Sequence, residues 1–416
     1  MEPLTLRVPS SKSETHRALL LAARSARPCR VVAPLLGADN RSTLACLQQL
    51  GAQARLDGGD VQFTPARLRP SAEALDCGNS GTTLRLLSGQ VALLDGGSVL
   101  TGDASLQGRP NGPLLDALAS LGASVGSEGG RAPLRITGPI RAGAVRLGPR
   151  VSSQYASALL LAMCLLPEGE SRLHLEAPVS SRPYLAITRD VAATFGLTWT
   201  EEEGPSGLTM VVPGGQRPAA ERVEVSGDWS GAAFPLVAAA LLGRSVALRG
   251  LRPDSPQGDR AILDILARFG LRHRWQGEVL VQAPAALQAP AAPIDLGATP
   301  DLFPALCALA ARAPGRTALC GAPSLRHKES DRIAAMVSGL RVLGVSADEA
   351  PDGATIEGRG ELAGGTVESH HDHRVYMAFR LLAPFTATPL QVRGAGCEAV
   401  SYPDFEAHFQ QLRAAG

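Results

Sequence analysis

Three apolar segments of helix length each begin among basic, hydroxyl or amide side chains. A Ser before such a segment is typical of a helix N-cap, and helix N-termini present free N–H groups and a positive dipole end to anions. The added cations and hydroxyls make these starts candidate sites for phosphate or carboxylate groups. The residues are Lys12, Ser13 and Arg17 in the first segment, Asn79, Gly81, Thr82 and Arg85 in the second, and Ser152, Ser153 and Gln154 in the third.

Three later apolar segments begin instead at Asp228, Asp301 and Asp372. Two charged clusters lie in the same part of the chain, LRHKESDR at 325–332 and HHDHR at 370–374. A charge run is usually a solvated face, and histidines beside an aspartate can also suggest a metal. HHDHR abuts the apolar run VYMAF, however, so part of it must lie at the start of a buried helix. The chain has no HExxH motif and no compact His/Cys cluster, so we expect no metal site.

Each of these motifs alone has an ordinary structural explanation. A Ser or Asp at a helix start is most often a plain cap, and a single Arg near one is most often a solvated surface charge. The segment GNSGTTLR is rich in Gly but lacks the spacing of a Walker loop or a dinucleotide-binding fingerprint. The functional interpretation therefore depends on which elements bring the segments together.

A repeating pattern indicates what those elements are. Five glycines follow apolar residues at intervals of 71, 74, 74 and 74 residues, and each precedes a strand-like alternating stretch. A Gly after an apolar helical run ends a helix. The chain is thus predicted to contain six units, each with a buried helix, a strand, a surface helix and a hairpin. The glycines are Gly51, Gly122, Gly196, Gly270 and Gly344.

Six units of this length favour two compact domains of three units each over a solenoid. The sixth unit is cut short by the end of the sequence, and we expect an N-terminal strand at 4–8 to complete it. That pairing would place the strand in the C-terminal domain. The chain would then cross between the domains near residues 10 and 225.

The composition limits the classes of partner. The 416 residues are 45% hydrophobic and only 4% aromatic, so Ala, Leu and Val must build a sizeable core. A net charge of +1 argues against a nucleic acid or a membrane surface as partner. The longest apolar run, near 156–166, is too short to span a bilayer, and the N-terminus has no apolar signal core, so we expect a cytoplasmic location. The seven cysteines include no CxxC pair and are expected to be buried thiols.

Eight motifs in order resemble the 5-enolpyruvylshikimate-3-phosphate (EPSP) synthase family of enolpyruvyl transferases. They are PSSKSETHR, GNSGTTLR, GRP, SSQ, SRPY, DLFP, HKESDR and DHR, and they extend over essentially the whole chain. The resemblance implies an α/β fold of two domains, each with three βαβαββ units around buried helices. Residues 11–225 would bind shikimate 3-phosphate, and residues 1–10 with 226–416 would carry acid–base and phosphoenolpyruvate-clamp residues. The active site would lie in the interdomain cleft.

The reaction implied by the resemblance is transfer of the enolpyruvyl group of phosphoenolpyruvate to the 5-hydroxyl of shikimate 3-phosphate. Phosphate is released after addition and elimination through a tetrahedral intermediate, in the shikimate pathway to chorismate and the aromatic amino acids. The resemblance implies no cofactor and no metal, because Arg and Lys neutralise the leaving phosphate. It also implies a monomer that is inhibited by glyphosate in the phosphoenolpyruvate site.

The resemblance assigns roles residue by residue. Asp301 would accept the proton of the 5-hydroxyl, and Glu329, helped by Lys328, would protonate the methylene carbon, with Lys12 as the fourth catalytic residue. Shikimate 3-phosphate would be bound by Lys12, Ser13, Arg17, Ser152, Ser153, Gln154, Ser181, Tyr184, Asp301 and Lys328. Phosphoenolpyruvate would be bound by Lys12, Asn79, Gly81, Thr82, Arg109, Gln154, Arg332, His373 and Arg374, with Arg85 nearby.

Four positions depart from the family pattern. Ser11 and Leu86 stand where a Gly and a Pro are frequent, and Ser324 stands where an Asn is frequent. Val400 occupies the place where some members carry a Lys that contacts phosphoenolpyruvate. The clamp is therefore expected to have one cation fewer or a substitute for it.

Two alternatives share the scaffold. One is the sister enzyme that transfers enolpyruvyl to UDP-N-acetylglucosamine, which usually has Asn where this chain has Ser13 and a Cys or Asp in the loop that here reads LQGRPNGP. The other is a catalytically inactive binding protein. Lys12, Asp301, Glu329 and three arginines argue against the second alternative.

Overall fold

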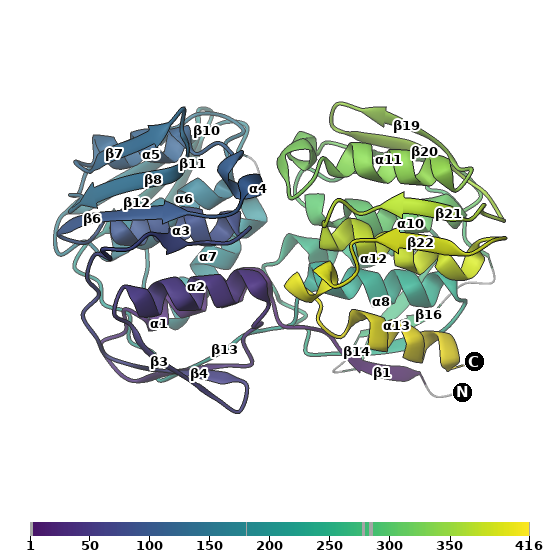
Figure 1. Ribbon diagram of the computed structural model, residues 1–416, viewed down its shortest axis with the longest axis horizontal. Coiled ribbons are helices and arrows are strands. Elements are labelled where there is room, and N and C mark those ends of the chain that lie inside the picture. The colour runs from purple at the N-terminus through teal and green to yellow at the C-terminus, as the bar shows by residue number, and fades with distance from the viewer. Residues whose placement is uncertain (1–2, 180, 277–278, 283–285, 416) are drawn as a thin grey trace. The chain divides into compact units, whose positions relative to one another are not determined.

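The computed structural model describes residues 3–179, 181–276, 279–282 and 286–415. The chain divides into two compact units. The first unit is residues 11–225, and the second unit is residues 1–10 together with 226–416 (Figure 1). Each unit has its own hydrophobic core.

The first unit packs three buried helices among three four-stranded sheets. The buried helices are α1 (Lys12–Ala22), α3 (Gly81–Val91) and α6 (Ser153–Cys164), and the outer ones are α2 (Ala38–Gln49), α4 (Ala104–Gln107), α5 (Gly112–Ser120) and α7 (Arg182–Thr194). The sheet orders are β13 (Arg222–Glu224)–β2 (Cys29–Val32)–β4 (Asp60–Thr64)–β3 (Gln53–Asp57), β5 (Leu75–Asp76)–β6 (Gly96–Thr101)–β8 (Arg131–Gly138)–β7 (Ser124–Glu128) and β9 (Ala144–Leu147)–β10 (Glu170–Glu176)–β12 (Gly207–Pro213)–β11 (Thr200–Gly204).

The second unit repeats this plan with two four-stranded sheets and one pair of strands. The buried helices are α8 (Trp229–Leu241), α10 (Phe303–Arg312) and α12 (His373–Leu382), and the others are α9 (Ile262–Arg268), α11 (Arg332–Val342) and α13 (Phe405–Ala414). The sheet orders are β1 (Leu4–Arg7)–β14 (Val246–Arg249)–β16 (Val279–Gln282)–β15 (Arg272–Trp275), β17 (Ile294–Asp295)–β18 (Gly315–Cys320)–β20 (Gly353–Gly358)–β19 (Ser346–Ala350) and β21 (Gly365–Glu368)–β22 (Leu390–Arg393).

The same pairing recurs in all five four-stranded sheets. The first two strands of each order are parallel, and both later pairings are antiparallel. The pair β21–β22 is parallel too. The five glycines that the sequence marks as helix stops follow α2, α5, α7, α9 and α11, with φ between +75° and +104°. A left-handed residue after the last helical turn turns the chain into the hairpin, as predicted.

The prediction that the N-terminal strand completes the sixth unit is wrong. Strand β1 pairs in parallel with β14, from Leu4 opposite Val246 to Arg7 opposite Arg249, and not with β21 or β22. The reason is an exchange of edge strands. Strand β13, which directly precedes α8, pairs with β2 of the first unit, so the sheet of β14 takes its parallel edge strand from the N-terminus.

The six buried helices begin at caps, with one exception. The side chains of Ser11, Ser80, Ser152, Asp228 and Asp372 each accept a hydrogen bond from a backbone N–H in the first turn. Asp301 does not cap α10, because it lies inside the 3₁₀ turn Pro300–Leu302 that precedes the helix. Its carboxylate is therefore available for other partners.

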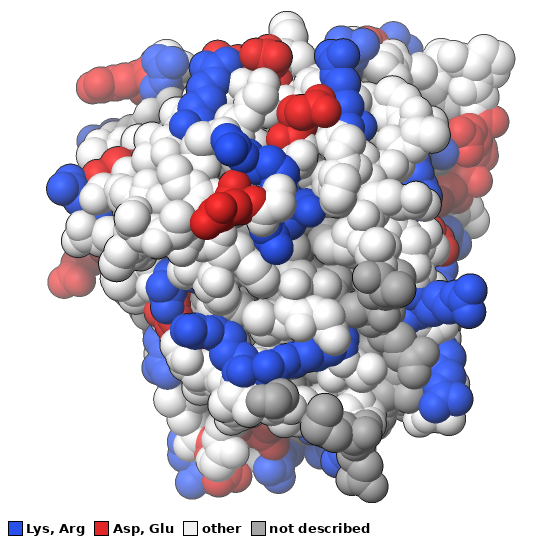
Figure 2. All heavy atoms as spheres, turned by 90° about the vertical axis from the view of Figure 1, so that its right-hand side faces the viewer, with Lys and Arg blue, Asp and Glu red and all other residues white. Residues whose placement is uncertain are grey.

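Surface and core agree with the composition. Five of the seven cysteines are buried, and Cys320 and Cys397 are half-buried. On the face shown in Figure 2, Lys and Arg side chains alternate with Asp and Glu. Among the described residues, no helix is both long and apolar enough to cross a membrane.

The close approach of α3 to α6 generates a stability prediction. A Cβ added at Gly89 would lie 2.5 Å from the backbone oxygen of Ala158. Gly89→Ala should lower the free energy of unfolding by about 1–3 kcal/mol, because the backbone clash outweighs the ~1 kcal/mol gain in helix propensity. Denaturant unfolding measures the change. Gly112→Ala, at the start of α5 with no atom within 4 Å of the added Cβ, is the matched control. Equal effects of the two substitutions would contradict this packing.

Candidate active site

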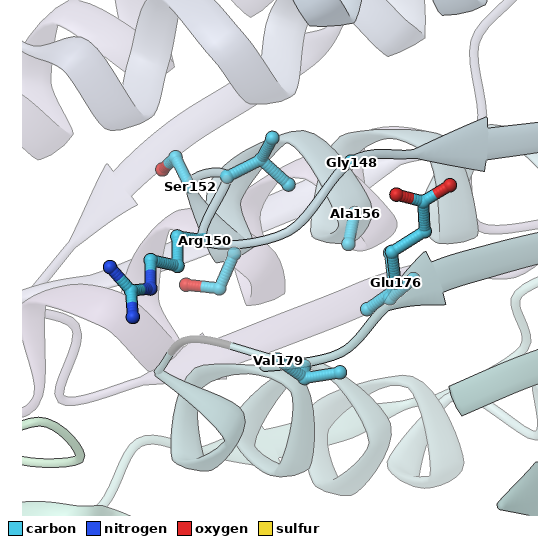
Figure 3. Close-up of a pocket in the computed structure, with 9 residues that line it drawn as sticks. Gly148, Arg150, Ser152, Ala156, Glu176 and Val179 are labelled. Carbon is cyan, nitrogen blue, oxygen red and sulfur yellow. The ribbon is translucent and has the colours of Figure 1, made fainter. Parts of the chain in front are cut away.

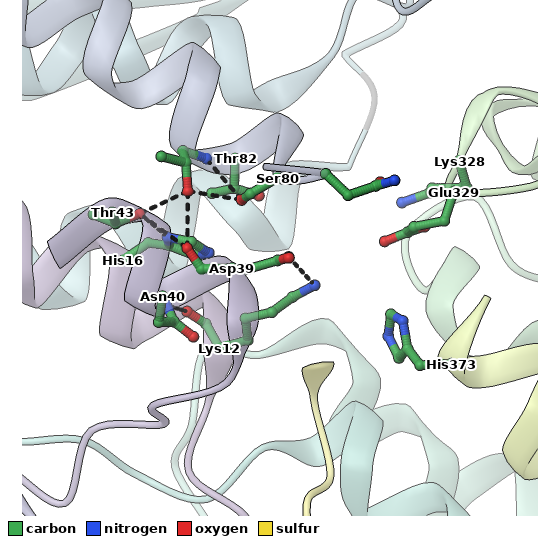
Figure 4. A network of polar contacts seen from close by, with 12 residues as sticks. Lys12, His16, Asp39, Asn40, Thr43, Ser80, Thr82, Lys328, Glu329 and His373 are labelled. Carbon is green, nitrogen blue, oxygen red and sulfur yellow. Dashed lines mark hydrogen bonds and ion pairs between the residues drawn. The ribbon is translucent and has the colours of Figure 1, made fainter. Parts of the chain in front are cut away.

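The start of α1 holds a lysine beside an aspartate. Lys12 Nζ lies 2.9 Å from Asp39 Oδ2, and the two side chains are 13% and 11% exposed (Figure 4). Asn40 Nδ2 donates to the Lys12 carbonyl at 3.2 Å. Helix α2 therefore fixes the ammonium group at the N-terminus of α1, where a bound anion would find both the charge and the helix end.

A buried polar network joins the starts of α1, α2 and α3. His16 Nδ1 lies 2.8 Å from Thr43 Oγ1, which lies 2.7 Å from Thr83 Oγ1 (Figure 4). Thr83 Oγ1 also donates to Ser80 Oγ at 2.8 Å. Burial lowers the pKa of His16 well below its ordinary value, and the nearby Lys12 lowers it further. His16 is thus a neutral ring that adds no charge beneath the anion-binding helix starts.

The start of α3 is tied to the start of α6. Arg85 donates to Gln154 Oε1 at 2.6 Å and to Asn111 Oδ1 at 3.1 Å. Gln154 Nε2 in turn donates to Thr82 Oγ1 at 2.9 Å. The guanidinium also lies over the Tyr155 ring, 5.5 Å from its centroid. Three of the predicted site residues are therefore brought together here, with Arg85 as the link.

Arg109 lies over the start of α3. It donates to the Asn79 backbone oxygen at 3.2 Å and to Asn79 Oδ1, while Asn79 Nδ2 donates to Asp103 Oδ2 at 2.6 Å. A Cβ added at Gly81 would lie 3.3 Å from Arg109 Nη1 and 3.2 Å from Arg85 Nη1. Gly81 is therefore the position at which two guanidinium groups approach the backbone closely.

Arg17 is buried, and its guanidinium joins the elements of the predicted sugar-phosphate site. It donates to Thr188 Oγ1 at 2.8 Å, to the Ser13 oxygen at 2.9 Å and to the Tyr184 oxygen at 3.4 Å. Burial lowers its pKa to about 10, so it stays charged at neutral pH. Its contacts therefore include the backbone oxygens of two predicted site residues, Ser13 and Tyr184.

A small pocket opens at the start of α6. Ser152 and Ser153 line it together with Arg150, and Glu176 and Val179 lie on its other side (Figure 3). Ser181, the N-cap residue of α7, has a left-handed φ of 51°. The sequence interpretation missed Arg150, whose place two residues before a Ser-Ser pair was the available signal.

The second unit gathers the residues predicted to act as acid and base around one arginine. Arg332 is 1% exposed and lies 2.8 Å from carboxylate oxygens of Asp301, Glu329 and Asp372. These three carboxylates raise the pKa of Arg332 against the effect of burial. Lys328 Nζ lies 3.3 Å from Asp301 Oδ1. Three carboxylates and two cations thus share one site.

The start of α12 adds a second arginine to this cluster. Arg374 lies 3.4 Å from Asp301 Oδ2 and donates to Ser230 Oγ, which donates to Asp228 Oδ1 at 2.5 Å. Arg374 Nη1 lies 2.7 Å from His373 Nε2, so that nitrogen is the acceptor and His373 is neutral. The arginines of the motifs HKESDR and DHR, Arg332 and Arg374, therefore both lie at Asp301.

Two departures from the family pattern are placed by the structure. Leu86 is 1% exposed on α3 and belongs to the core of the first unit. Val400 ends a short 3₁₀ helix (Cys397–Val400) and is half-buried. Among the described residues, no group of three or more His, Cys, Asp or Glu side chains could hold a metal ion.

The chain matches one protein family over nearly all its length. The family described as EPSP synthase (3-phosphoshikimate 1-carboxyvinyltransferase) matches residues 4–409. The 3-phosphoshikimate 1-carboxyvinyltransferase of Methanocorpusculum labreanum is 42% identical over 410 residues, which are 98% of this chain and 95% of the relative. That of Halobacterium salinarum is 39% identical over 409 residues, or 96% and 94% of the two chains.

Solved structures agree with the sequence match. An EPSP synthase of Acinetobacter baumannii superposes with a TM-score of 0.80 at 31% identity, covering 98% of this chain and 95% of that one. The fold and the site therefore define an enolpyruvyl-transferring enzyme of mixed α/β structure. The chain belongs to the EPSP synthase family, whose members carry out the 3-phosphoshikimate 1-carboxyvinyltransferase step of the shikimate pathway. The fold class, the enzyme class and the family that the motifs indicated are confirmed.

Proposed function

We propose that the first unit binds shikimate 3-phosphate. Ser152, Ser153 and Ser181 bind its 3-phosphate, supported by their places at the starts of α6 and α7. Lys12, Ser13, Arg17, Gln154 and Tyr184 complete the site. The observation that supports this assignment best is the network of Arg17, which joins Ser13 and Tyr184 although they are 171 residues apart in the sequence.

We propose that phosphoenolpyruvate takes its cations from both units. Lys12 and Arg109 come from the first unit, and Arg332 and Arg374 from the second. Asn79, Gly81, Thr82, Gln154 and His373 line the same site, and Arg85 orients Gln154. Phosphoenolpyruvate carries a phosphate and a carboxylate, and a set of fixed cations and N–H donors binds such a molecule without rearrangement.

The proposed chemistry is addition followed by elimination. The 5-hydroxyl oxygen bonds to C2 of phosphoenolpyruvate while Asp301 takes its proton, and Glu329, oriented by Lys328 and Arg332, protonates C3. In the second step Glu329 removes a proton from C3, the bond from C2 to the phosphate oxygen breaks, and phosphate leaves with the proton that Asp301 had taken, so both carboxyl groups return to their starting states. Asp301 and Glu329 are held on one arginine, which supports their acting as a pair.

A coupled phosphate-release assay tests the activity directly. We expect release from phosphoenolpyruvate with shikimate 3-phosphate and none with UDP-N-acetylglucosamine. Release with the UDP-sugar alone would favour the sister transferase, and no release with either acceptor would favour an inactive binding protein. We also propose a cytoplasmic location. The proposed monomeric state rests on the family resemblance, and sedimentation measures it.

Glu329→Gln tests the proton role. The amide keeps the shape of the side chain and an oxygen for Arg332, so the affinity for shikimate 3-phosphate should be retained. Loss of the transferable proton should lower kcat by about 10²–10⁴. Steady-state kinetics measure this. The control is Glu349→Gln, because Glu349 is ion-paired with Arg326 at 3.0 Å and does not belong to the cluster around Arg332. Near-normal turnover of Glu329→Gln would transfer the role elsewhere, with Lys12 as the next candidate.

Substrate should draw the two units together. Each unit carries cations proposed to bind the same anionic substrates, and an anion that both sets bind would relieve the repulsion between like charges. We therefore expect small-angle scattering to show a smaller radius of gyration when shikimate 3-phosphate is added. A radius that stays constant at saturating substrate would contradict this expectation.

Gly81→Ala tests the shape of the phosphoenolpyruvate site. The added methyl group would displace the guanidinium groups of Arg85 and Arg109 by a few tenths of an ångström, since it would start 3.2 and 3.3 Å from them. With Gly81 the enzyme should be inhibited by glyphosate, and Gly81→Ala should weaken glyphosate binding more than phosphoenolpyruvate binding, because glyphosate is the longer molecule. Competition kinetics measure both, with Gly204→Ala as a control in open space. Equal weakening of both ligands, or an uninhibited wild type, would contradict this account.

A further inference from the structure

A fifth carboxylate faces the acid–base cluster of the second unit without any assigned role. Asp259 lies in the 3₁₀ turn Gly258–Ala261, which packs against α8. The residue is only 8% exposed. The charged groups that act on it are Asp301, Arg374, Asp228 and Lys328. The charge of Asp301, the residue proposed to take the 5-hydroxyl proton, therefore acts on Asp259.

The hydrogen bonds distinguish Asp259 from its neighbours. Asp228 accepts from Ser230 and from the Gly231 N–H, and Asp301, Glu329 and Asp372 each accept from Arg332. The buried Oδ1 of Asp259 has no hydrogen-bond donor among the residues that the structure describes. A buried carboxylate oxygen without a donor is costly, so such a group holds a proton.

The charges of the cluster lead to the same conclusion. Five carboxyl groups (Asp228, Asp259, Asp301, Glu329 and Asp372) share three fixed cations (Lys328, Arg332 and Arg374), while His373 is neutral. A fully ionised cluster would repel an anionic substrate. One bound proton reduces the excess negative charge, and Asp259 is the carboxyl with the poorest set of partners.

We propose that Asp259 is a positioning residue of the acid–base centre, with a protonated carboxyl that leaves Asp301 as the ionised base. This rests on the proposed role of Asp301. A negative charge on Asp259 would make Asp301 hold its proton more tightly and would draw Arg374 and Lys328 away from the substrate. Burial, followed by the charge of Asp301, raises the pKa of Asp259 to about 8, which agrees with the geometry.

Unfolding as a function of pH tests the proton on Asp259 independently of activity. The native state keeps this proton from the ordinary carboxyl pKa of about 4 up to about 8, whereas the unfolded chain releases it, so the wild type loses stability as pH rises through this window. Asp259→Asn lacks that loss. The melting temperature of Asp259→Asn minus that of the wild type should therefore increase from pH 5 to pH 8. Asp264→Asn, an exposed aspartate on α9, should show a constant difference. A constant difference for Asp259→Asn too would mean that Asp259 is ionised, and would overturn the proposal.

Kinetics test the effect on Asp301. The protonated fraction of a group with a pKa near 8 falls about tenfold from pH 7 to pH 9. The ratio of kcat/KM for phosphoenolpyruvate, Asp259→Asn over wild type, should rise by about the same factor over that range. A flat ratio together with the expected unfolding slope would show a proton that does not influence the base, and would overturn the positioning role. A wild type without phosphate release would instead refute the proposed function and leave the unfolding result standing.

Discussion

The burial of Arg332 is the constraint on which the second unit depends. A guanidinium that is 1% exposed has to be surrounded by carboxylates, because an unpaired buried charge would destabilise the fold strongly. Asp372 meets this need while it caps α12, Glu329 meets it from the residues before α11, and Asp301 meets it from a 3₁₀ turn. One structural requirement therefore brings three distant segments to a single point. The same requirement brings the proposed base and acid together, and two further cations, Lys328 and Arg374, lie at Asp301.

In the first unit, neutral side chains connect the helix starts. The hydrogen bonds that hold its helix starts together run through Thr43, Thr83, Ser80 and the neutral His16. Where a cation is buried, as at Arg17, its donors are directed to backbone oxygens and hydroxyls of the same region. Two carboxylates act on these cations: Asp39 pairs with Lys12, and the buried Glu14 lies in the same first turn of α1 as an influence on Arg17.

Local rules predicted the elements of this fold well, and long-range partners poorly. The glycines after α2, α5, α7, α9 and α11 and most of the helix caps follow from residue type and spacing alone. The pairing of β1 with β14 does not, because an edge strand is chosen by which sheet lacks one, and the sequence does not contain that information. The same holds for the site: a helix start revealed Ser152 and a charged motif revealed Arg332, whereas Asp39 and Asp259 are important only through the side chains folded against them.

In the proposed function, substrate binding and proton transfer depend on residues of both units. Charges of one sign in one unit would bind anions tightly but offer no group for proton transfer, and the paired carboxylates of Asp301 and Glu329 alone would repel the substrates. In the proposed enzyme the anion's own charge replaces the missing counter-charge of the first unit. It also releases Lys328, Arg332 and Arg374 from part of their interaction with carboxylates. A base that loses cation contacts holds a proton more readily, so binding the anionic substrate prepares Asp301 to accept the proton that the addition step delivers.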